Sequence, residues 1–394
     1  MTRTPLQGDT ITNVKILVVT TPGPGHVNPL RPLVEALLAG GDEVTVAAAP
    51  SAEILVEDTG AAFCPCGNEE FDWFDRLRAR TRGNPGDGLA PERISHYFLP
   101  RLFGEIATDD MIDDVVSCGR RFEPNVVLFE TYAFAGPLAA DVLGVAAVNH
   151  LLGPLPQHDV MELVNDAVSP LWRSFDREVP GYGGVYRDLT IEICPPSLEP
   201  LHVPAGDRVT LRPAPLPREV ANAGPRPLVY VTLGTSFNAN VHIFRAALDG
   251  LASEPIEVVV TVGADQDPAA LVPIPANARV ERFIPQATLL PTCSAVVHHG
   301  GAGTMFGSLA HALPQVVIPQ GADNFVNADM LERAGVAEVL LPGEVTAARV
   351  RDAVRRTLRE PSFARAGHTA ADEIATMATP EDVAKDLRIR YGDR

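Results

Sequence analysis

The chain has 394 residues, and its 50 acidic residues exceed its 32 basic residues to give a formal net charge of −18. An acidic surface repels phosphate backbones and anionic lipids, so this balance argues against a nucleic-acid binder and against a peripheral membrane protein. Hydrophobic residues make up 46% of the chain, which excludes global disorder. At roughly 150 residues per domain, the length predicts two or three domains, and a cleft between domains is where small ligands bind.

The N-terminal segment shows no export signal, because no long apolar stretch follows its basic residues. No other stretch approaches the ~18–20 apolar residues that a membrane span needs. We therefore expect a cytoplasmic protein whose residues 1–13 form a flexible tail. The five cysteines are scattered, with Cys64 and Cys66 as the only close pair, so packed or surface thiols are favoured over a metal site.

The first predicted strand, residues 15–20, is followed by a glycine-containing turn that carries His26. Open α/β sheets bind ligands beyond the carboxyl ends of their strands, and a histidine placed there can act as a base near neutral pH. Asn28 and Pro29 stand where a dinucleotide fingerprint has its third glycine, which disfavours NAD binding. On this turn alone, a structural and a catalytic role for His26 are equally plausible.

A helix is predicted after this turn, with Asn28 as its N-cap, Pro29 at its first position and Gly40-Gly41 at its end. Its apolar stripe has the spacing of an amphipathic helix and comprises Leu30, Leu33, Val34, Leu37 and Leu38. The next strand is predicted at residues 43–48.

Residues 66–122 fit no βα unit well, and we expect them to form an irregular pocket wall. Aromatic and apolar side chains of this segment and of residues 161–172 either line a pocket for a hydrophobic molecule or belong to the core. The candidates are Phe71, Trp73, Phe74, Tyr97, Phe98, Phe103, Met161 and Trp172.

A buried strand at residues 126–129 ends in Glu130, and a further strand is predicted at residues 146–148. If the strand at 126–129 neighbours the first strand, the carboxylate of Glu130 can hold the ring of His26 and stabilise its imidazolium, as the acid of a hydrolase triad does. The alternative for Glu130 is a solvated strand end or a helix cap.

Residues 195–227 contain nine prolines and are predicted to be an extended linker, because prolines exclude a helix or a central strand. Strands of the second half are predicted at residues 228–233, 257–262, 279–283, 295–298 and 315–318. Together with the helical patterns between them, they indicate a second α/β domain with a parallel sheet. Three helices are predicted at residues 345–358, 360–377 and 380–390.

The most specific pattern is the run His298-His299-Gly300-Gly301-Ala302-Gly303-Thr304 at the end of a buried strand. Its glycines allow the backbone to approach a ligand closely, and the N–H groups of the following helix favour an anion. No Gly-Lys-Ser/Thr closes the turn, so it is not a P-loop. We interpret it as a diphosphate site, with a tight turn holding two packed histidines as the alternative.

Two further loops of the second half carry polar side chains. Gly234, Thr235 and Ser236 offer hydroxyl and backbone donors to a phosphate, and Asp323 and Asn324 can bind sugar hydroxyls. An ordinary polar turn and helix capping are the respective alternatives. Residues 265–267 read Asp-Gln-Asp, but we expect no metal there or elsewhere.

These motifs together resemble the GT-B fold, family 1 glycosyltransferases, in particular bacterial enzymes that glycosylate polyketides, macrolides and enediynes. The resemblance covers roughly residues 14–390 and rests on the His26 turn and the His298–Thr304 run. It implies an α/β fold with an acceptor-binding domain at 14–194, a linker at 195–227 and a donor-binding domain at 228–378. A C-terminal helix in 379–394 would pack back on the first domain.

The resemblance also implies roles for single residues. His26 would be the base that deprotonates an acceptor hydroxyl, with Glu130 where many relatives have an aspartate. The donor diphosphate would contact Gly234, Thr235, Ser236, His299, Gly301, Gly303 and Thr304. The nucleobase of the donor would contact the segment of Phe283, Ile284 and Gln286, and the sugar would contact Asp323 and Asn324. The acceptor would contact Phe71, Trp73, Tyr97, Phe98, Phe103 and Met161.

The expected reaction is an inverting, metal-independent transfer that needs no cofactor besides its nucleotide-sugar co-substrate. Asn324 replaces the glutamine of glucose-using relatives, which favours a deoxysugar on TDP over UDP-glucose. The expected partners are the nucleotide sugar and a small hydrophobic aglycone, and the sequence leaves a homodimer open.

Four alternatives remain at this point. A macrolide-inactivating glucosyltransferase would use UDP-glucose, and a GT-B sugar-nucleotide epimerase would turn over its substrate without an acceptor. A dehydrogenase would bind NADH, and a non-catalytic protein would bind the sugar nucleotide alone.

Overall fold

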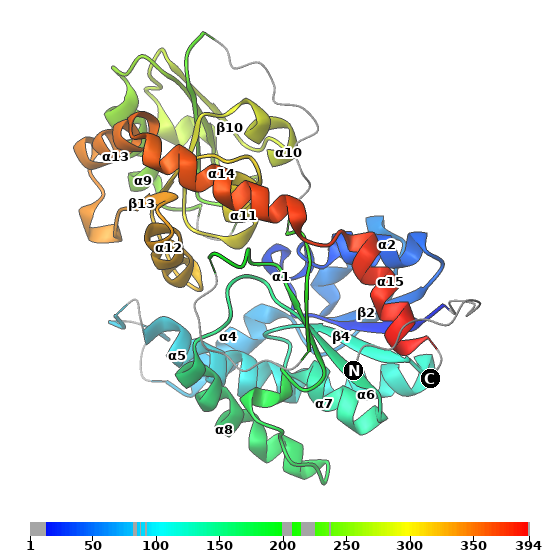
Figure 1. The fold of residues 1–394 in the computed structure, drawn as a ribbon. Helices are drawn as coiled ribbons and strands as arrows, with labels where there is room; N and C mark the ends of the chain where they lie inside the picture. The colour runs from blue at the N-terminus through cyan, green and yellow to red at the C-terminus, as the bar shows by residue number, and fades with distance from the viewer. Residues whose placement is uncertain are drawn as a thin grey trace, which may run out of the picture.

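The computed structural model describes residues 13–81, 85–86, 88–90, 93–198, 207–213, 225–235 and 238–392. Within them the chain forms two parallel sheets in two α/β halves (Figure 1). The sheet of the first half has seven strands in the order β3-β2-β1-β4-β5-β6-β7, and that of the second has six in the order β10-β9-β8-β11-β12-β13. Parallel neighbours put the carboxyl ends of all strands of a sheet on one edge, where ligands bind.

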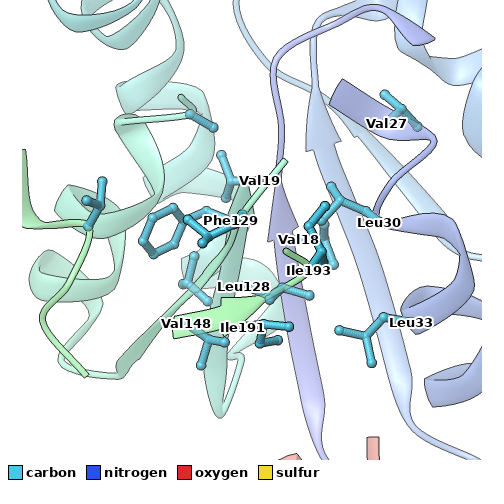
Figure 2. Packing of buried hydrophobic residues seen from close by; sticks show 14 of the residues in the cluster. Val18, Val19, Val27, Leu30, Leu33, Leu128, Phe129, Val148, Ile191 and Ile193 are labelled. Carbon is cyan, nitrogen blue, oxygen red and sulfur yellow. The ribbon is translucent and has the colours of Figure 1, made fainter. Parts of the chain in front are cut away.

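The strands of the first sheet are β1 (Lys15–Val19), β2 (Glu43–Ala48), β3 (Ala62–Pro65), β4 (Val126–Glu130), β5 (Ala146–His150), β6 (Leu189–Glu192) and β7 (Asp207–Thr210). The central strands β1 and β4 are apolar apart from Lys15 and Glu130 at their ends, because helices cover both faces of the sheet. Val18 and Leu128 are register partners on β1 and β4, and both are fully buried (Figure 2). The predicted strands are confirmed, and β3, β6 and β7 are additional.

The longer helices of the first half are α2 (Arg31–Ala39), α4 (Glu70–Ala79), the π-helix η4 (Leu99–Ala107), α6 (Thr108–Phe122), α7 (Ala135–Leu143) and α8 (His158–Ser174). The short ones are α1 (Pro24–Val27), η1 (Pro50–Ala52), α3 (Glu53–Val56), η2 (Glu57–Thr59), α5 (Ile94–Phe98) and η5 (Tyr182–Gly184). The prediction that residues 66–122 are irregular is therefore wrong, since α4, α5, η4 and α6 lie there.

The predicted N-cap Asn28 is also wrong. Its backbone is helical, with φ −60° and ψ −36°, and its N–H donates to the carbonyl of Pro24, so it ends α1 rather than starting α2. An N-cap needs an extended backbone to turn its side chain toward the next turn. Helix α2 begins at Arg31 without a side-chain cap.

The second half contains β8 (Leu228–Thr232), β9 (Glu257–Thr261), β10 (Ala278–Glu281), β11 (Ala295–His298), β12 (Gln315–Val317) and β13 (Ala337–Val339). Its helices are α9 (Val241–Leu251), η6 (Pro268–Leu271), α10 (Gln286–Leu289), η7 (Leu290–Thr292), α11 (Ala302–Ala310), α12 (Asn324–Arg333), η8 (Pro342–Glu344), α13 (Ala347–Arg359) and α14 (Pro361–Thr376). The five predicted strands and the predicted C-terminal helices are all present.

The two halves are connected twice. The segment after β7 reaches α14, where the guanidinium of Arg212 donates to the carbonyls of Ile374 and Ala375. The last helix, α15 (Pro380–Tyr391), lies beside α2 of the first half (Figure 1). Strand β7 is an edge strand of the first sheet inside the predicted linker 195–227. No helix in the described part of the chain has both the length and the apolarity to cross a membrane.

Candidate active site

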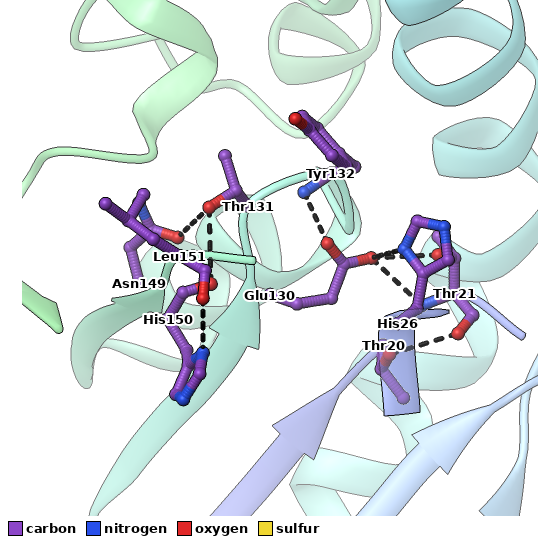
Figure 3. Close-up of polar contacts among 9 residues, drawn as sticks. All are labelled: Thr20, Thr21, His26, Glu130, Thr131, Tyr132, Asn149, His150 and Leu151. Carbon is purple, nitrogen blue, oxygen red and sulfur yellow. Dashed lines mark hydrogen bonds and ion pairs between the residues drawn. The ribbon is translucent and has the colours of Figure 1, made fainter. Parts of the chain in front are cut away.

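The first feature of the site is a contact between His26 and Glu130 (Figure 3). Because β1 and β4 are neighbours in register, the turn after β1 and the end of β4 meet at the same sheet edge. Nδ1 of His26 lies 3.2 Å from Oε1 of Glu130. The backbone N–H and the hydroxyl of Thr21 also donate to Oε1, and the N–H of Tyr132 donates to Oε2.

His26 and Glu130 each favour the ionised form of the other. Burial alone would lower the pKa of His26, but the attraction and hydrogen bond of Glu130, together with attraction to two further carboxylates, outweigh burial and raise the pKa above 6.5. Burial alone would raise the pKa of Glu130, but attraction to His26 and the donated hydrogen bonds lower it. The ionised carboxylate only accepts hydrogen bonds, so Nδ1 carries the proton and Nε2 is the basic nitrogen.

A second carboxylate, Glu70, also faces His26 and was not recognised in the sequence. A Cβ at Gly23 would lie 3.9 Å from Oε2 of Glu70 and 4.0 Å from Cδ2 of His26, so both side chains approach the same bare backbone position. Attraction to Glu70 and to Asp323 helps to raise the pKa of His26. Asp323 belongs to the second half, so the negative charges around the imidazole come from both halves.

Aromatic rings enclose the imidazole. The ring centroid of Phe103, on η4, lies 5.8 Å from that of His26, and that of Tyr132 lies 6.2 Å away. Tyr132 also borders a cleft between the halves, opposite Asp323, Val326 and Asn327. The base thus lies close to a cleft that Tyr132 borders.

The glycine-rich turn of the second half is built around two buried histidines. The N–H of Gly300 donates to Nδ1 of His298, whose Nε2 lies 2.7 Å from the side-chain oxygen of Gln315. His298 therefore carries its proton on Nε2. Burial lowers the pKa of His298 to about 4 and keeps it neutral at neutral pH. His298 therefore stabilises the turn through its hydrogen bond with the N–H of Gly300.

The ring of His299 packs between two glycines. A Cβ at Gly234 would come within 2.5 Å of its Cε1, and a Cβ at Gly301 within 2.4 Å of its Nε2. Burial, with a smaller contribution from His298, lowers the pKa of His299 to about 3. His299 is consequently neutral at neutral pH, and it can donate one N–H to an anion but brings no positive charge.

The helix α11 begins directly after Gly301, and its first backbone bond runs from Met305 to the carbonyl of Gly301. The N–H groups of Ala302, Gly303 and Thr304 therefore point out of the helix end. A Cβ at Gly303 would meet no atom within 4 Å. The hydroxyl of Thr304 accepts a hydrogen bond from Gln286 at 2.9 Å, so Gln286 positions Thr304.

The other predicted donor contacts differ in exposure. Phe283 is 68% exposed, as a platform for stacking would be, and Ile284 beside it is half-buried. Thr235 is exposed after β8, and Ser236 lies outside the described residues. Asn324 is 2% exposed, and its side chain accepts from the N–H of Gly321 and donates to Asp323. Asn324 therefore shapes the loop and does not face the cleft.

Asp323 faces the cleft. Burial raises the pKa of its carboxyl, although hydrogen bonds from Asn327 and Asn324 act in the opposite direction. Asn327 was missed in the sequence, and its position four residues after Asp323, one helical turn along α12, was the signal that could have found it.

The predicted acceptor contacts divide into three groups. Trp73 and Met161 are 0% and 1% exposed, so they belong to the core, and this part of the prediction is wrong. The indole of Trp73 donates to Asp110 instead. Phe71 is 65% exposed. Phe103 lies at the base, and the half-buried Tyr97 and Phe98 pack on each other with ring centroids 5.2 Å apart. Phe74 is half-buried and Trp172 is fully buried.

No group of three or more His, Cys, Asp or Glu side chains among the described residues is arranged to hold a metal ion. Residues 265–267 also show no such group. Asp267 instead caps η6 by accepting from the N–H of Ala269.

Comparison with known proteins decides the family. Models of the erythromycin biosynthesis protein CIII-like family match residues 94–205, as its N-terminal domain, and 245–389, as its C-terminal domain. The chain belongs to this family. The chain is a glycosyltransferase, and its two-sheet architecture is the GT-B fold, so both sequence-based predictions are confirmed.

The similarity to relatives and solved structures extends over nearly the whole chain. The 10-deoxymethynolide desosaminyltransferase of Streptomyces venezuelae is 31% identical, covering 95% of this chain and 96% of the relative. The TDP-daunosamine transferase DnrS of Streptomyces peucetius is 30% identical, with the same coverage. The Streptomyces sp. SF2575 glycosyltransferase SsfS6 with thymidine diphosphate is 26% identical, covers 96% of this chain and 100% of that one, and has a TM-score of 0.77.

Proposed function

We propose that this glycosyltransferase moves a deoxysugar from TDP to a hydroxyl of a hydrophobic polyketide-type aglycone, with inversion and without a metal. The observation that carries the proposal is the placement of the His26–Glu130 pair on one half and of Asp323 with the glycine-rich turn on the other. A base on one side and an anion site on the other are what a direct displacement requires.

The reaction is a single displacement. Nε2 of His26 takes the proton of the acceptor hydroxyl while the oxygen attacks the anomeric carbon. The bond from that carbon to the diphosphate oxygen breaks, and its electron pair leaves with TDP. Glu130 stabilises the imidazolium and keeps the proton of Nδ1 in place. A positioned base of this kind contributes ~10²–10⁴-fold.

The leaving diphosphate is stabilised by donors that carry no formal charge. The N–H groups at the start of α11, the hydroxyl of Thr304 and the neutral imidazole of His299 supply them. An acidic chain can therefore bind a small anion, because backbone dipoles do not depend on its net charge of −18. This donor set also removes the need for a cation.

The choice of TDP and a deoxysugar is supported by the relatives. Their names include a TDP-daunosamine transferase and a 2-deoxy-L-fucose transferase, and SsfS6 was solved with thymidine diphosphate. Several act on named aglycones such as 10-deoxymethynolide, tylactone and aklavinone. The corresponding role of this chain is in antibiotic biosynthesis.

Mass spectrometry of the products tests the proposal. The protein is incubated with a TDP-deoxysugar or UDP-glucose, with or without 10-deoxymethynolide or aklavinone, in the presence of EDTA. We expect an acceptor-dependent glycoside from the TDP donor with inverted anomeric configuration by NMR. Faster transfer from UDP-glucose, turnover without an acceptor, loss of activity in EDTA or retained configuration would each contradict it.

A further inference from the structure

Asn327, on α12, is fully buried and lines the cleft between the halves. Its Nδ2 donates to the carbonyl oxygen of Gly300 at 2.8 Å and to Oδ2 of Asp323 at 2.9 Å. Both partners are acceptors, so the orientation of the amide is fixed by its own contacts. One side chain thereby connects the glycine-rich turn to the carboxylate in the cleft.

The oxygen of the same amide has no partner. Oδ1 of Asn327 is buried and accepts no hydrogen bond from any residue that the structure describes. A buried acceptor without a donor is costly, and native proteins contain few of them, often at sites where a ligand supplies the missing group. The amide cannot rotate to solve this, because rotation would point its oxygen at two other acceptors.

The facing wall of the cleft leaves space beside this oxygen. A Cβ at Gly153 would lie 3.7 Å from Oδ1 of Asn327, so the absence of a side chain there leaves space beside the oxygen. Pro154 and Pro156 follow in the same wall, and proline has no backbone N–H. The cleft is also lined by three side chains that carry donors, none of which bonds to Oδ1: Ser95, Tyr132 and Gln157. A molecule that occupies the cleft can supply the missing donor.

We infer that Asn327 is a further sugar-binding residue, whose Oδ1 accepts a hydrogen bond from a hydroxyl of the donor sugar. This inference rests on the proposed function, since the neighbouring Asp323 is its sugar-binding carboxylate. Asn327 would distinguish sugars by the ring carbon whose hydroxyl reaches Oδ1, because a sugar that lacks this hydroxyl leaves Oδ1 without a hydrogen-bond donor. Through Nδ2 the residue also holds Asp323 at a fixed place relative to the diphosphate turn.

Titration calorimetry with TDP and with TDP-α-D-glucose, a fully hydroxylated probe, tests the inference. We compare the wild type with Gly153→Ala, Asn327→Ala and the control Gly343→Ala. The methyl group of Gly153→Ala makes an ordinary contact, so folding is preserved, but it fills the space of the sugar hydroxyl. In Gly343→Ala the methyl group meets no atom within 4 Å.

We expect the wild type and Gly343→Ala to bind TDP-glucose more tightly than TDP. Gly153→Ala and Asn327→Ala should reduce this preference roughly three- to tenfold, the value of one neutral hydrogen bond, with TDP affinity within about twofold of wild type for Gly153→Ala. Equal weakening of TDP and TDP-glucose by Gly153→Ala, or no wild-type preference for TDP-glucose, would overturn the inference. A wild type that does not bind TDP at all contradicts the proposed function instead.

Discussion

Two histidines of the site show how residue environment decides protonation. At His26, three carboxylates outweigh the effect of burial, and the pKa is raised. At His299, burial and the neighbouring His298 both act to lower the pKa, which falls to about 3. The sequence predicted that both residues lie at sheet edges. It did not predict their different charge states, because Glu70 and Asp323 reach His26 from distant parts of the chain.

The raised pKa of His26 predicts a pH dependence of the reaction. His26 must be neutral to accept a proton, so kcat/KM should rise with pH through a pKa above 6.5. Glu130→Gln and Glu70→Gln each remove an attraction that favours the imidazolium, so the rise should move to lower pH. The pH profile of kcat/KM, or NMR titration of the His26 ring without substrate, measures this shift.

The matched control is Glu69→Gln. Glu69 precedes Glu70 but accepts from the backbone N–H of Ser51, and it is absent from the groups that act on His26. Its removal should leave the profile in place. A profile unchanged in both Glu130→Gln and Glu70→Gln would show that these carboxylates do not act on the base.

At the scale of elements, the turn between β11 and α11 could be predicted from the sequence. The packing of its His299 against the loop after β8 could not. The run from His298 to Thr304 has a local signature of strand, glycines and helix start. The contact of His299 with Gly234 joins loops after two neighbouring strands, which only the pairing of β8 with β11 brings together. Within residues 66–122, η4 was missed because it is a π-helix, whose period differs from the usual 3.6 residues. The α-helix α6 could have been predicted, because Met111, Ile112, Val115 and Val116 have helical spacing.

Gly234→Ala tests the role of this contact between His299 and Gly234. The new methyl group would lie 2.5 Å from Cε1 of His299, so the ring must leave its place between Gly234 and Gly301. We expect TDP to bind at least about tenfold more weakly, as for the loss of one or more hydrogen bonds to a charged group. Titration calorimetry with TDP provides the measurement.

Gly144→Ala controls for backbone strain. Gly144 has the same φ of +72° as Gly234, but its Cβ would meet no atom within 4 Å. This variant should lose some stability and keep the TDP affinity of the wild type. Equal TDP affinities for the two variants would remove His299 from the diphosphate site.

At the scale of the whole molecule, α15 joins the end of the chain to the first half. Nε of Arg388 donates to Asp42 at 2.8 Å and 3.0 Å, and the carboxylate is fully buried. The sequence predicted two halves, a proline-rich connection and the helix. It did not predict this ion pair, which joins residues 346 positions apart.

Arg388→Ala would leave the carboxylate of Asp42 buried without its cation. We expect a loss of about 2 kcal/mol in the free energy of unfolding, below the ~3–5 kcal/mol of a fully buried pair because Arg388 is partly exposed. Arg390→Ala, on the same helix, breaks only more exposed pairs and should cost less than about 1 kcal/mol. Chemical denaturation followed by circular dichroism compares them, and equal losses would argue against the anchoring role of Arg388.

The base lies on the first half and the nucleotide site on the second, and His26→Ala tests this separation most directly. Transfer from the TDP-deoxysugar and the Kd of TDP are measured on the same preparation. The account predicts that transfer falls by at least about 10²-fold while the Kd changes by less than about twofold, because the base and the nucleotide site lie on different halves. Transfer at the wild-type rate would contradict the assignment of His26 as the base, and loss of TDP binding would contradict the placement of the nucleotide on the second half.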